Sequence, residues 1–187
     1  MSLEVTLGEP GSAGPDAKPA HRRFSLIKQL AQCASVAALA WVSFFVVSHF
    51  VLESITVDGW SMAPTLLNSD HYLLNRWVYH FRSPKPQEIV VIRDPDTHGL
   101  AVKRVIAKAG DLVFLKDGAV YVNGRKLDER YLPYGTPTFP LTSPGTQQLF
   151  LCGPDGYFVL GDNRTNSVDS RSYGPVLRSS ILGVIIQ

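Results

Sequence analysis

This sequence lacks the several cysteines that could cross-link a small fold by disulfides, and it lacks the strongly basic charge typical of proteins that bind nucleic acid. It has only two cysteines, Cys33 and Cys152, and a formal net charge of +2. A near-neutral charge gives no basic stripe of the kind that binds nucleic acid, so no nucleic-acid partner is expected. The histidines His71, His80 and His98 lack Cys or His partners at finger-like spacing, so no metal site and no cofactor are predicted.

Charged residues are also absent from Leu30 to Leu52, a run of 23 residues without Asp, Glu, Lys or Arg. As a helix this run would be about 35 Å long, enough to cross a hydrocarbon core of about 30 Å. It ends without the small-residue cleavage pattern of a signal peptide, so an uncleaved membrane anchor is predicted. A buried helix of a soluble protein is the alternative. Because Cys33 lies in this run and Cys152 beyond it, no disulfide between them is expected.

The run divides the chain into three predicted parts. Residues 1–29 form a cytoplasmic tail, disordered where Gly, Pro, Ala and acidic residues dominate. Residues 30–52 form the transmembrane helix, and residues 53–187 form a β-rich domain. Basic residues at positions 21–28 precede the helix, so the positive-inside rule leaves the tail in the cytoplasm and the domain outside. The chain is therefore expected to be a single-pass protein of the plasma membrane.

Beyond the anchor no helical period exceeds two turns, whereas short apolar runs rich in β-branched or aromatic residues alternate with turn residues. The predicted fold class is mostly β: an open barrel or sandwich of short antiparallel strands, preceded by the one transmembrane helix. Strands are expected at Ile55–Val57, Tyr72–Leu74, Ile89–Ile92, Leu100–Ala107, Tyr157–Leu160 and Ile181–Ile186, with a hairpin over Leu112–Val122.

Gly and Pro punctuate the same region. Asp117-Gly118 is predicted to be the two-residue turn of the hairpin, and Asn123-Gly124 a second turn of that kind. Residues 130–155 are rich in proline and glycine, so they are expected to form a long loop with little regular structure.

Ser61 is the first candidate for chemistry. It lies between Gly59 and Pro64, which together favour a tight bend that would expose one side chain. A serine hydroxyl becomes a nucleophile only beside a base. A serine that merely shapes the turn is the alternative.

Lys103 is the candidate base, because none of the three histidines lies in a stretch that suggests a Ser-His-Asp triad. It stands between apolar residues within the predicted strand Leu100–Ala107. If it points inward, burial lowers its pKa and favours the neutral amine, which can accept a proton from a serine hydroxyl. An edge-strand lysine that discourages aggregation is the alternative.

Three segments in this order resemble the type I signal peptidases, which are membrane-anchored Ser/Lys proteases. They are Ser61-Met62-Ala63-Pro64-Thr65-Leu66, Lys103 to Asp111, and the polar stretch from Gly161 to Arg171. Each alone could be an ordinary turn, strand or solvated loop. Their combination behind an anchor of this orientation covers roughly residues 30–187.

This resemblance implies that Ser61 is the nucleophile and Lys103 the general base, and that Ser167 orients the amine by a hydrogen bond. It also implies that the Ser61 backbone N–H is an oxyanion donor. Four further residues would form structural ion pairs near the site: Arg104, Asp162, Asp169 and Arg171.

The implied substrates are the signal peptides of exported preproteins, with small residues at the first and third positions before the cut. The other partner is membrane lipid, beside which the site would lie.

Two positions depart from the family pattern. Gly59 stands where many relatives carry a serine that helps the oxyanion, so the second oxyanion donor is unassigned. Gln87-Glu88 replaces a usual Gly-Asp pair. Two other functions stay open: a self-cleaving Ser/Lys protease, and a non-catalytic β module tethered to the membrane.

Overall fold

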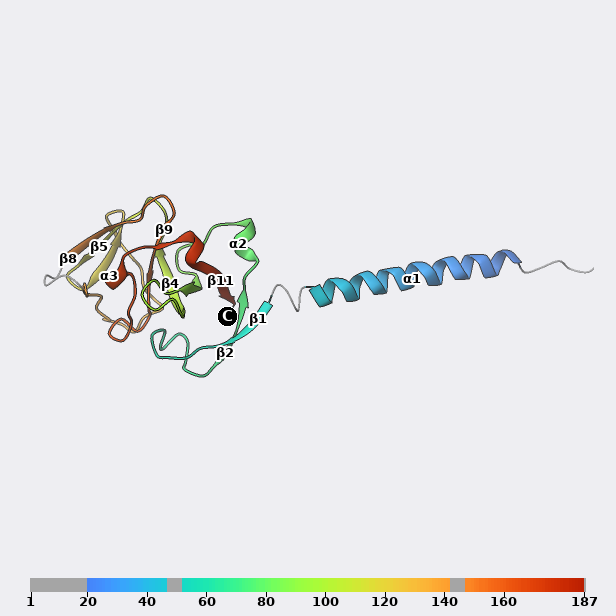
Figure 1. Ribbon diagram of the computed structural model, residues 1–187, viewed down its shortest axis with the longest axis horizontal. Coiled ribbons are helices and arrows are strands. Elements are labelled where there is room, and N and C mark those ends of the chain that lie inside the picture. The colour runs from blue at the N-terminus through green and yellow to red at the C-terminus, as the bar shows by residue number, and fades with distance from the viewer. Residues whose placement is uncertain (1–19, 47–51, 142–146, 187) are drawn as a thin grey trace, which may run out of the picture. The chain divides into compact units, whose positions relative to one another are not determined.

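The computed structural model describes residues 20–46, 52–141 and 147–186, and it forms two units, of which the first contains a single helix. Helix α1 spans Ala20–Val46 (Figure 1). It therefore begins before the expected start at Leu30, because basic residues are good helix formers and do not end a helix. The other expected boundary also differs, since Leu52 begins a strand.

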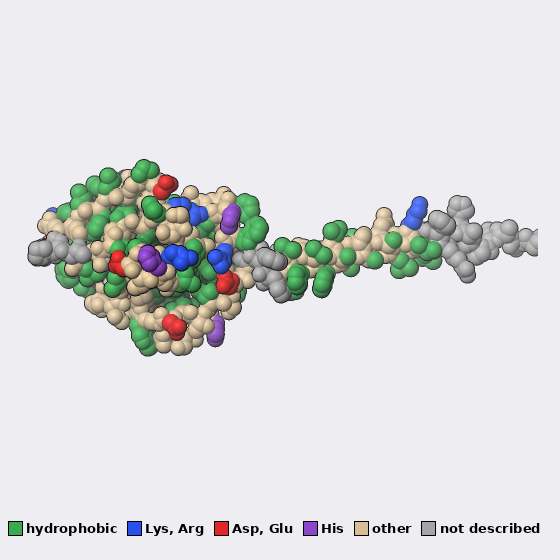
Figure 2. Space-filling model, in the orientation of Figure 1, with side chains coloured by type: hydrophobic (Ala, Val, Ile, Leu, Met, Phe, Trp, Pro, Cys, Tyr) green, Lys and Arg blue, Asp and Glu red, His purple; other side chains and the backbone are tan. Residues whose placement is uncertain are grey.

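Within α1, the segment Leu26–Val46 is long and apolar enough to cross a membrane. Its large apolar side chains are exposed in the structure, and Figure 2 shows hydrophobic side chains along the helix. This is consistent with a membrane anchor. The predicted disorder of the first 19 residues lies outside the described part of the chain.

The second unit holds two antiparallel sheets, so the mostly β fold class is confirmed (Figure 1). What we call the large sheet has the strand order β1-β2-β11-β3-β4-β9-β10. Its strands are β1 (Leu52–Thr56), β2 (His71–Asn75), β3 (Ile89–Arg93), β4 (Leu100–Ala107), β9 (Gly156–Leu160), β10 (Val176–Leu177) and β11 (Ile181–Ile186).

What we call the small sheet has the strand order β7-β6-β5-β8. Its strands are β5 (Leu112–Lys116), β6 (Ala119–Val122), β7 (Arg125–Lys126) and β8 (Gln147–Leu151). Three short helical turns complete the described elements: α2 (Val78–Phe81), α3 (Ser170–Tyr173) and η2 (Arg178–Ser180).

Both predicted hairpin turns are confirmed. Asp117 and Gly118 have φ values of +51° and +75°, and Asn123 and Gly124 have φ values of +52° and +80°. Two successive residues with positive φ match the right-handed twist of the flanking strands, and Asn-Gly and Asp-Gly adopt this geometry most readily.

The long loop predicted over residues 130–155 is wrong for its last part. Gln147–Leu151 forms β8, which pairs with β5 along its whole length. Neighbouring prolines and glycines hid a five-residue strand whose partner lies more than 30 residues earlier in the sequence. Pairing with β5 overrode the weak local preference.

The apolar core explains how the site is held. One cluster packs Met62 and Leu66 against Leu74 of β2 and Val91 of β3. A second cluster joins the two sheets through residues such as Ile106 of β4 and Val113 of β5. The loop after β1 is therefore pinned to the large sheet by buried side chains on either side of its bend.

Candidate active site

The loop that carries Ser61 is fixed by its own turn. Gly59 has φ +113°, a backbone conformation that side chains disfavour, and its N–H donates to Asn68 Oδ1 at 2.7 Å. Met62 and Leu66 are at most 1% exposed. Because these neighbours face the core, Ser61 is left half-buried at the lip of a cleft.

A second set of contacts ties this loop to the turn after β9. The Asn163 backbone N–H donates to the Ser61 carbonyl at 2.9 Å, and Asn163 Nδ2 donates to the Trp60 carbonyl at 3.0 Å. The Thr65 hydroxyl donates to Asp162 Oδ2 at 2.5 Å. Asn163 and Thr65 lay inside the recognised segments, but bonds between segments about 100 residues apart leave no signal in one sequence.

Lys103 reaches the same place from β4. Its Nζ donates to Ser61 Oγ at 3.3 Å, and the residue is only 4% exposed. Burial lowers the pKa of the Lys103 amine below its ordinary value, and the nearby carboxylates of Asp169 and Asp94 only partly oppose this. Asp94 was missed by sequence reasoning because nothing near it in the sequence marks it as a neighbour of Lys103.

Arg104, the next residue of β4, forms a buried ion pair with Asp162. Its Nε and Nη2 donate to the two carboxylate oxygens of Asp162 at 2.8 and 2.6 Å. Since Asp162 also accepts the Thr65 hydroxyl, one carboxylate joins the strand of Lys103 to the loop of Ser61. A two-point contact of this kind fixes orientation as well as distance.

Arg171 and Asp169 form the second buried pair. Arg171 Nε and Nη2 donate to the two oxygens of Asp169 at 2.8 and 2.9 Å, and both side chains are at most 2% exposed. Asp169 also accepts the Gly161 backbone N–H at 3.0 Å. The four charged residues predicted near the site therefore form two pairs that hold the turn after β9 in place.

Ser167 lies close to the nucleophile loop, although its predicted hydrogen bond is not formed. A Cβ at Gly161 would come within 2.5 Å of both the Ser167 Cβ and the Ser61 carbonyl oxygen, so Gly161 lies between the two serines. Ser167 is 8% exposed, and among the described residues its hydroxyl has no hydrogen-bond partner.

Sequence reasoning missed Arg164, a third buried cation of the same turn. It is 2% exposed, donates to the Gly161 carbonyl at 3.0 Å, and pairs with Glu129 Oε1 at 2.6 Å. It also donates to the Thr138 hydroxyl. Its basic side chain stood in the recognised polar stretch, but its partners lie in the proline-rich loop and could not be assigned.

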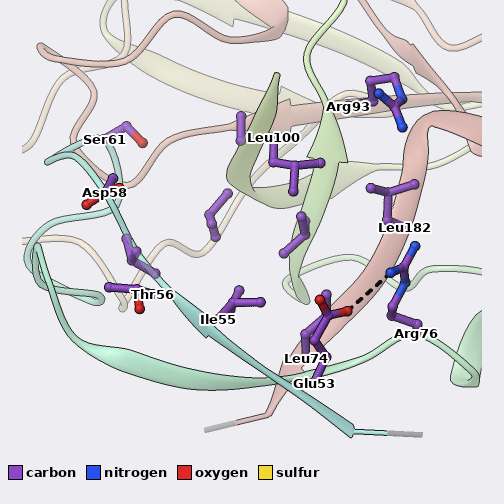
Figure 3. Close-up of a pocket in the computed structure, with 14 residues that line it drawn as sticks. Glu53, Ile55, Thr56, Asp58, Ser61, Leu74, Arg76, Arg93, Leu100 and Leu182 are labelled. Atoms are coloured by element: carbon purple, nitrogen blue, oxygen red, sulfur yellow. Dashed lines mark hydrogen bonds and ion pairs between the residues drawn. The ribbon is translucent and has the colours of Figure 1, made fainter. Parts of the chain in front are cut away.

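A cleft of about 460 Å³ opens beside Ser61 (Figure 3). Its walls include β1 and the first residues of β4, and its floor is apolar, with Leu74, Val91 and Leu182. Of the described histidines beyond the anchor, His71, His80 and His98, none lines it. Within the described residues, no cluster of three or more His, Cys, Asp or Glu side chains could hold a metal ion.

Both walls of this cleft present free strand edges. In the part of the chain that the structure describes, β1 pairs only with β2, and β9 pairs with β4 only from Arg104 onward. The outer edge of β1 and the edge of β4 over Leu100–Lys103 therefore have unpaired backbone groups. Such edges accept an added strand.

Comparisons with known proteins identify the family. Residues 27–186 match the family described as signal peptidase, peptidase S26. Signal peptidase I V of Bacillus subtilis (strain 168) is 35% identical over 150 residues, which cover 74% of this chain and 86% of that protein. The chain belongs to the signal peptidase I family.

Other signal peptidases match to a similar degree. Signal peptidase IB of Staphylococcus aureus (strain Mu50 / ATCC 700699) is 34% identical over 169 residues, which cover 84% of this chain and 88% of that protein. Probable signal peptidase I-2 of Synechocystis sp. is 38% identical over 142 residues, and the match spans 61% of its length.

Among solved structures, a crystal structure of a signal peptidase I from Enterococcus faecalis V583 is 31% identical. The match covers 56% of this chain and 98% of the chain in that crystal structure, with a TM-score of 0.47. Membership of the S26 signal peptidases makes this chain a serine peptidase of the Ser/Lys class. The expected family is therefore confirmed.

Proposed function

We propose that this signal peptidase I cleaves signal peptides from secreted preproteins with Ser61 as nucleophile and Lys103 as general base. Family membership supports the reaction. The observation that supports the two residues is the 3.3 Å separation of Lys103 Nζ and Ser61 Oγ where the lysine is 4% exposed. A buried amine favours its neutral form, which has a lone pair to accept the serine proton.

The reaction has two stages. Lys103 takes the Ser61 proton as Oγ attacks the scissile carbonyl carbon, and the resulting ammonium gives that proton to the leaving amine when the C–N bond breaks. The mature protein then departs, and the signal peptide remains as an ester on Ser61. Water, deprotonated by the same amine, hydrolyses the ester and regenerates the hydroxyl.

Other groups near the pair would support these steps. The Ser61 backbone N–H is one donor to the developing oxyanion, and Gly59 has no side chain to provide a second. The Ser167 hydroxyl, which has no partner among the described residues, would orient the Lys103 amine. The buried pairs described above would keep β4 and the nucleophile loop in register during both stages.

The substrate would bind as an added strand between the free edges of β1 and β4. Small side chains at the first and third positions before the cut would enter shallow apolar pockets near Ser61. The apolar floor at Leu74 and Val91 supports this preference, because a side chain at every second position of a strand points to the same face.

Helix α1 would be the single membrane anchor, with the tail in the cytoplasm and residues 53–187 as the extracytoplasmic peptidase domain at the plasma membrane. Exposed apolar side chains near the cleft, Trp60 at 56% and Leu100 at 67%, support a domain surface that dips into lipid. Trp side chains favour the membrane–water interface.

The decisive experiment is cleavage of a preprotein by the full chain in detergent, beside Ser61→Ala. Loss of cleavage by a folded Ser61→Ala variant is expected. Equal cleavage by that variant would refute the nucleophile. Family membership favours this enzyme over a self-cleaving protease or a non-catalytic tethered module, and uncleaved preprotein with the unaltered chain would reopen both.

A further inference from the structure

The substrate cleft carries charge at the end away from Ser61. Four charged side chains line it: Glu53, Asp58, Arg76 and Arg93 (Figure 3). Asp58 lies beside Ser61, whereas the other three lie toward the amino ends of the flanking strands. These charges have no part in the proposed reaction.

Arg93 is the unpaired cation of this set. Glu53 and Arg76 neutralise each other in an ion pair of 3.1 Å. Arg93 is exposed and, within the described chain, has no carboxylate partner, since its one recorded bond is to the His98 carbonyl at 3.4 Å. Val91 and Arg93 both line the cleft, so the arginine side chain is on the same face as the apolar floor.

The topology of the large sheet limits the directions in which a substrate strand can lie. Four antiparallel steps lead from β1 through β2, β11 and β3 to β4, so β1 and β4 run in the same direction. A strand added between them is therefore parallel to both or antiparallel to both.

Chain connectivity chooses between these directions. Helix α1 ends at Val46 and β1 begins at Leu52, so the amino end of β1 is the end tied to the anchor. The apolar part of a signal peptide is held by the same membrane, and it would enter the cleft at that end. The substrate then runs parallel to β1 and reaches Ser61 with its cleavage site.

This direction places Arg93 one strand away from residues upstream of the cut, because β3 pairs with the other edge of β4, and the Arg93 side chain lines the same cleft. Arg93 pairs in register with Leu100, which precedes Lys103 by three residues of β4. A strand advances about 3.3 Å per residue, so Leu100 lies about 10 Å upstream of the base. Leu100 is then level with about the fourth position before the cut, and the long Arg93 side chain, which starts one strand away, would reach substrate side chains about four to six positions before the cut.

We infer that Arg93 is a specificity-determining residue that favours an acidic side chain, and disfavours a basic one, about four to six positions before the cut. The inference rests on the proposed function and names a preference of the same site. A carboxylate there would pair with an otherwise unpaired guanidinium at a solvent-exposed edge. Pairs of this kind change affinity about two- to fivefold.

The test is a peptide panel with the full chain in detergent. The parent peptide has Ala at the first and third positions before the cut. Asp, Asn or Lys is placed at the fifth position before the cut or, as a position control, at the second position after it. The Asp peptide is expected to exceed the Lys peptide about two- to fivefold in kcat/KM, chiefly through KM, and added salt should reduce the difference.

Arg93→Glu should reverse this preference, so that the Lys peptide exceeds the Asp peptide when the kcat/KM of each is divided by that of the Asn peptide for the same variant. Arg125→Glu, the same charge change at an exposed site of the small sheet, should keep the original preference. An unchanged preference in Arg93→Glu would overturn the inference, and so would an equal effect at the position after the cut. Failure of the unaltered enzyme to cleave the parent peptide would instead refute the proposed function.

Discussion

Lys103 and Lys116 both stand in antiparallel strands, yet the two sheets treat them differently. Lys103 in β4 of the large sheet is 4% exposed, whereas Lys116 in β5 of the small sheet is at the surface. Arg104 is likewise buried and paired, whereas Arg125 of β7 is exposed. The small sheet keeps its charges in water, as is usual.

The difference shows that the free-energy cost of burying charged groups falls on the large sheet. The large sheet buries a lysine without a salt bridge and compensates for neighbouring charges with two-point ion pairs. A fold built only for stability would avoid this arrangement, because burying charge costs free energy. Among the described residues, the buried lysine and its two-point ion pairs belong to the large sheet and its loops, so substitutions at matched positions in the two sheets should separate catalysis from packing.

The largest expected contrast is in activity. Lys103→Arg should abolish preprotein cleavage, because a guanidinium stays protonated and cannot act as a base. Lys116→Arg makes the same change on the small sheet and should leave kcat/KM unaltered. Cleavage assays with both folded variants measure this, and residual turnover by Lys103→Arg comparable with the parent would remove Lys103 from the mechanism.

The next largest contrast should be in stability, between the loss of a buried ion pair and the loss of an exposed one. Asp162→Asn leaves Arg104 buried without its counter-charge, and it should lower the free energy of unfolding by about 3–5 kcal/mol. Asp128→Asn breaks the exposed pair with Arg130 and should change the free energy of unfolding by less than about 0.5 kcal/mol. Urea unfolding followed by tryptophan fluorescence compares them; equal losses would mean that the buried pair carries no special share of stability.

A smaller effect should follow from Thr65, which joins the nucleophile loop to Asp162. Thr65→Val keeps the shape but removes the hydroxyl, so kcat should fall roughly tenfold with little change in KM. Thr65→Ser should restore the rate. Thr136→Val, which removes a hydroxyl bonded to the Pro133 carbonyl, is the matched control and should have no effect. A rise in KM without a fall in kcat would contradict a positioning role for Thr65.

The sequence predicted strands in both sheets where the local signal was strong, and it missed strands whose pairing is distant. Leu100–Ala107 and Ile181–Ile186 were predicted with their observed bounds, because long apolar β-branched runs need no partner to be recognised. Strand β8 was missed because its pairing with β5 is not local. The start of α1 was missed because charge marks the limit of an apolar run, and helices continue through charged residues.

The site residues differ in the same way: some were marked by the local sequence, and others matter only through contacts with distant parts of the chain. Recognised segments supplied Ser61, Lys103 and the ion-pair residues Asp162 and Arg104, with roles that the family resemblance implied. Asn163 and Arg164 gain their importance from contacts with Trp60 and Glu129, which only the folded chain brings near. The bond expected between Ser167 and Lys103 is not formed, and the Ser167 hydroxyl has no hydrogen-bond partner among the described residues.

The central claim is that Lys103 is held neutral by burial, and pH-dependent stability tests it most directly. The unfolded lysine has a pKa of about 10.4, and burial lowers the folded value. Between these two pKa values the unfolded chain binds the extra proton, so Lys103 makes the free energy of unfolding rise with pH across that window. Its cost to stability is greatest below the folded pKa.

Lys103→Met keeps the apolar stem and removes the amine, so it isolates this contribution. Urea unfolding of the parent and Lys103→Met should be measured from neutral pH to about pH 10, close to the pKa of an unfolded lysine. The Met variant should be inactive yet more stable near neutral pH, and its advantage should shrink as the pH approaches 10. A Met variant that is less stable than the parent at every pH would contradict the account, because Lys103 would then be a stabilising cation and not a neutral base.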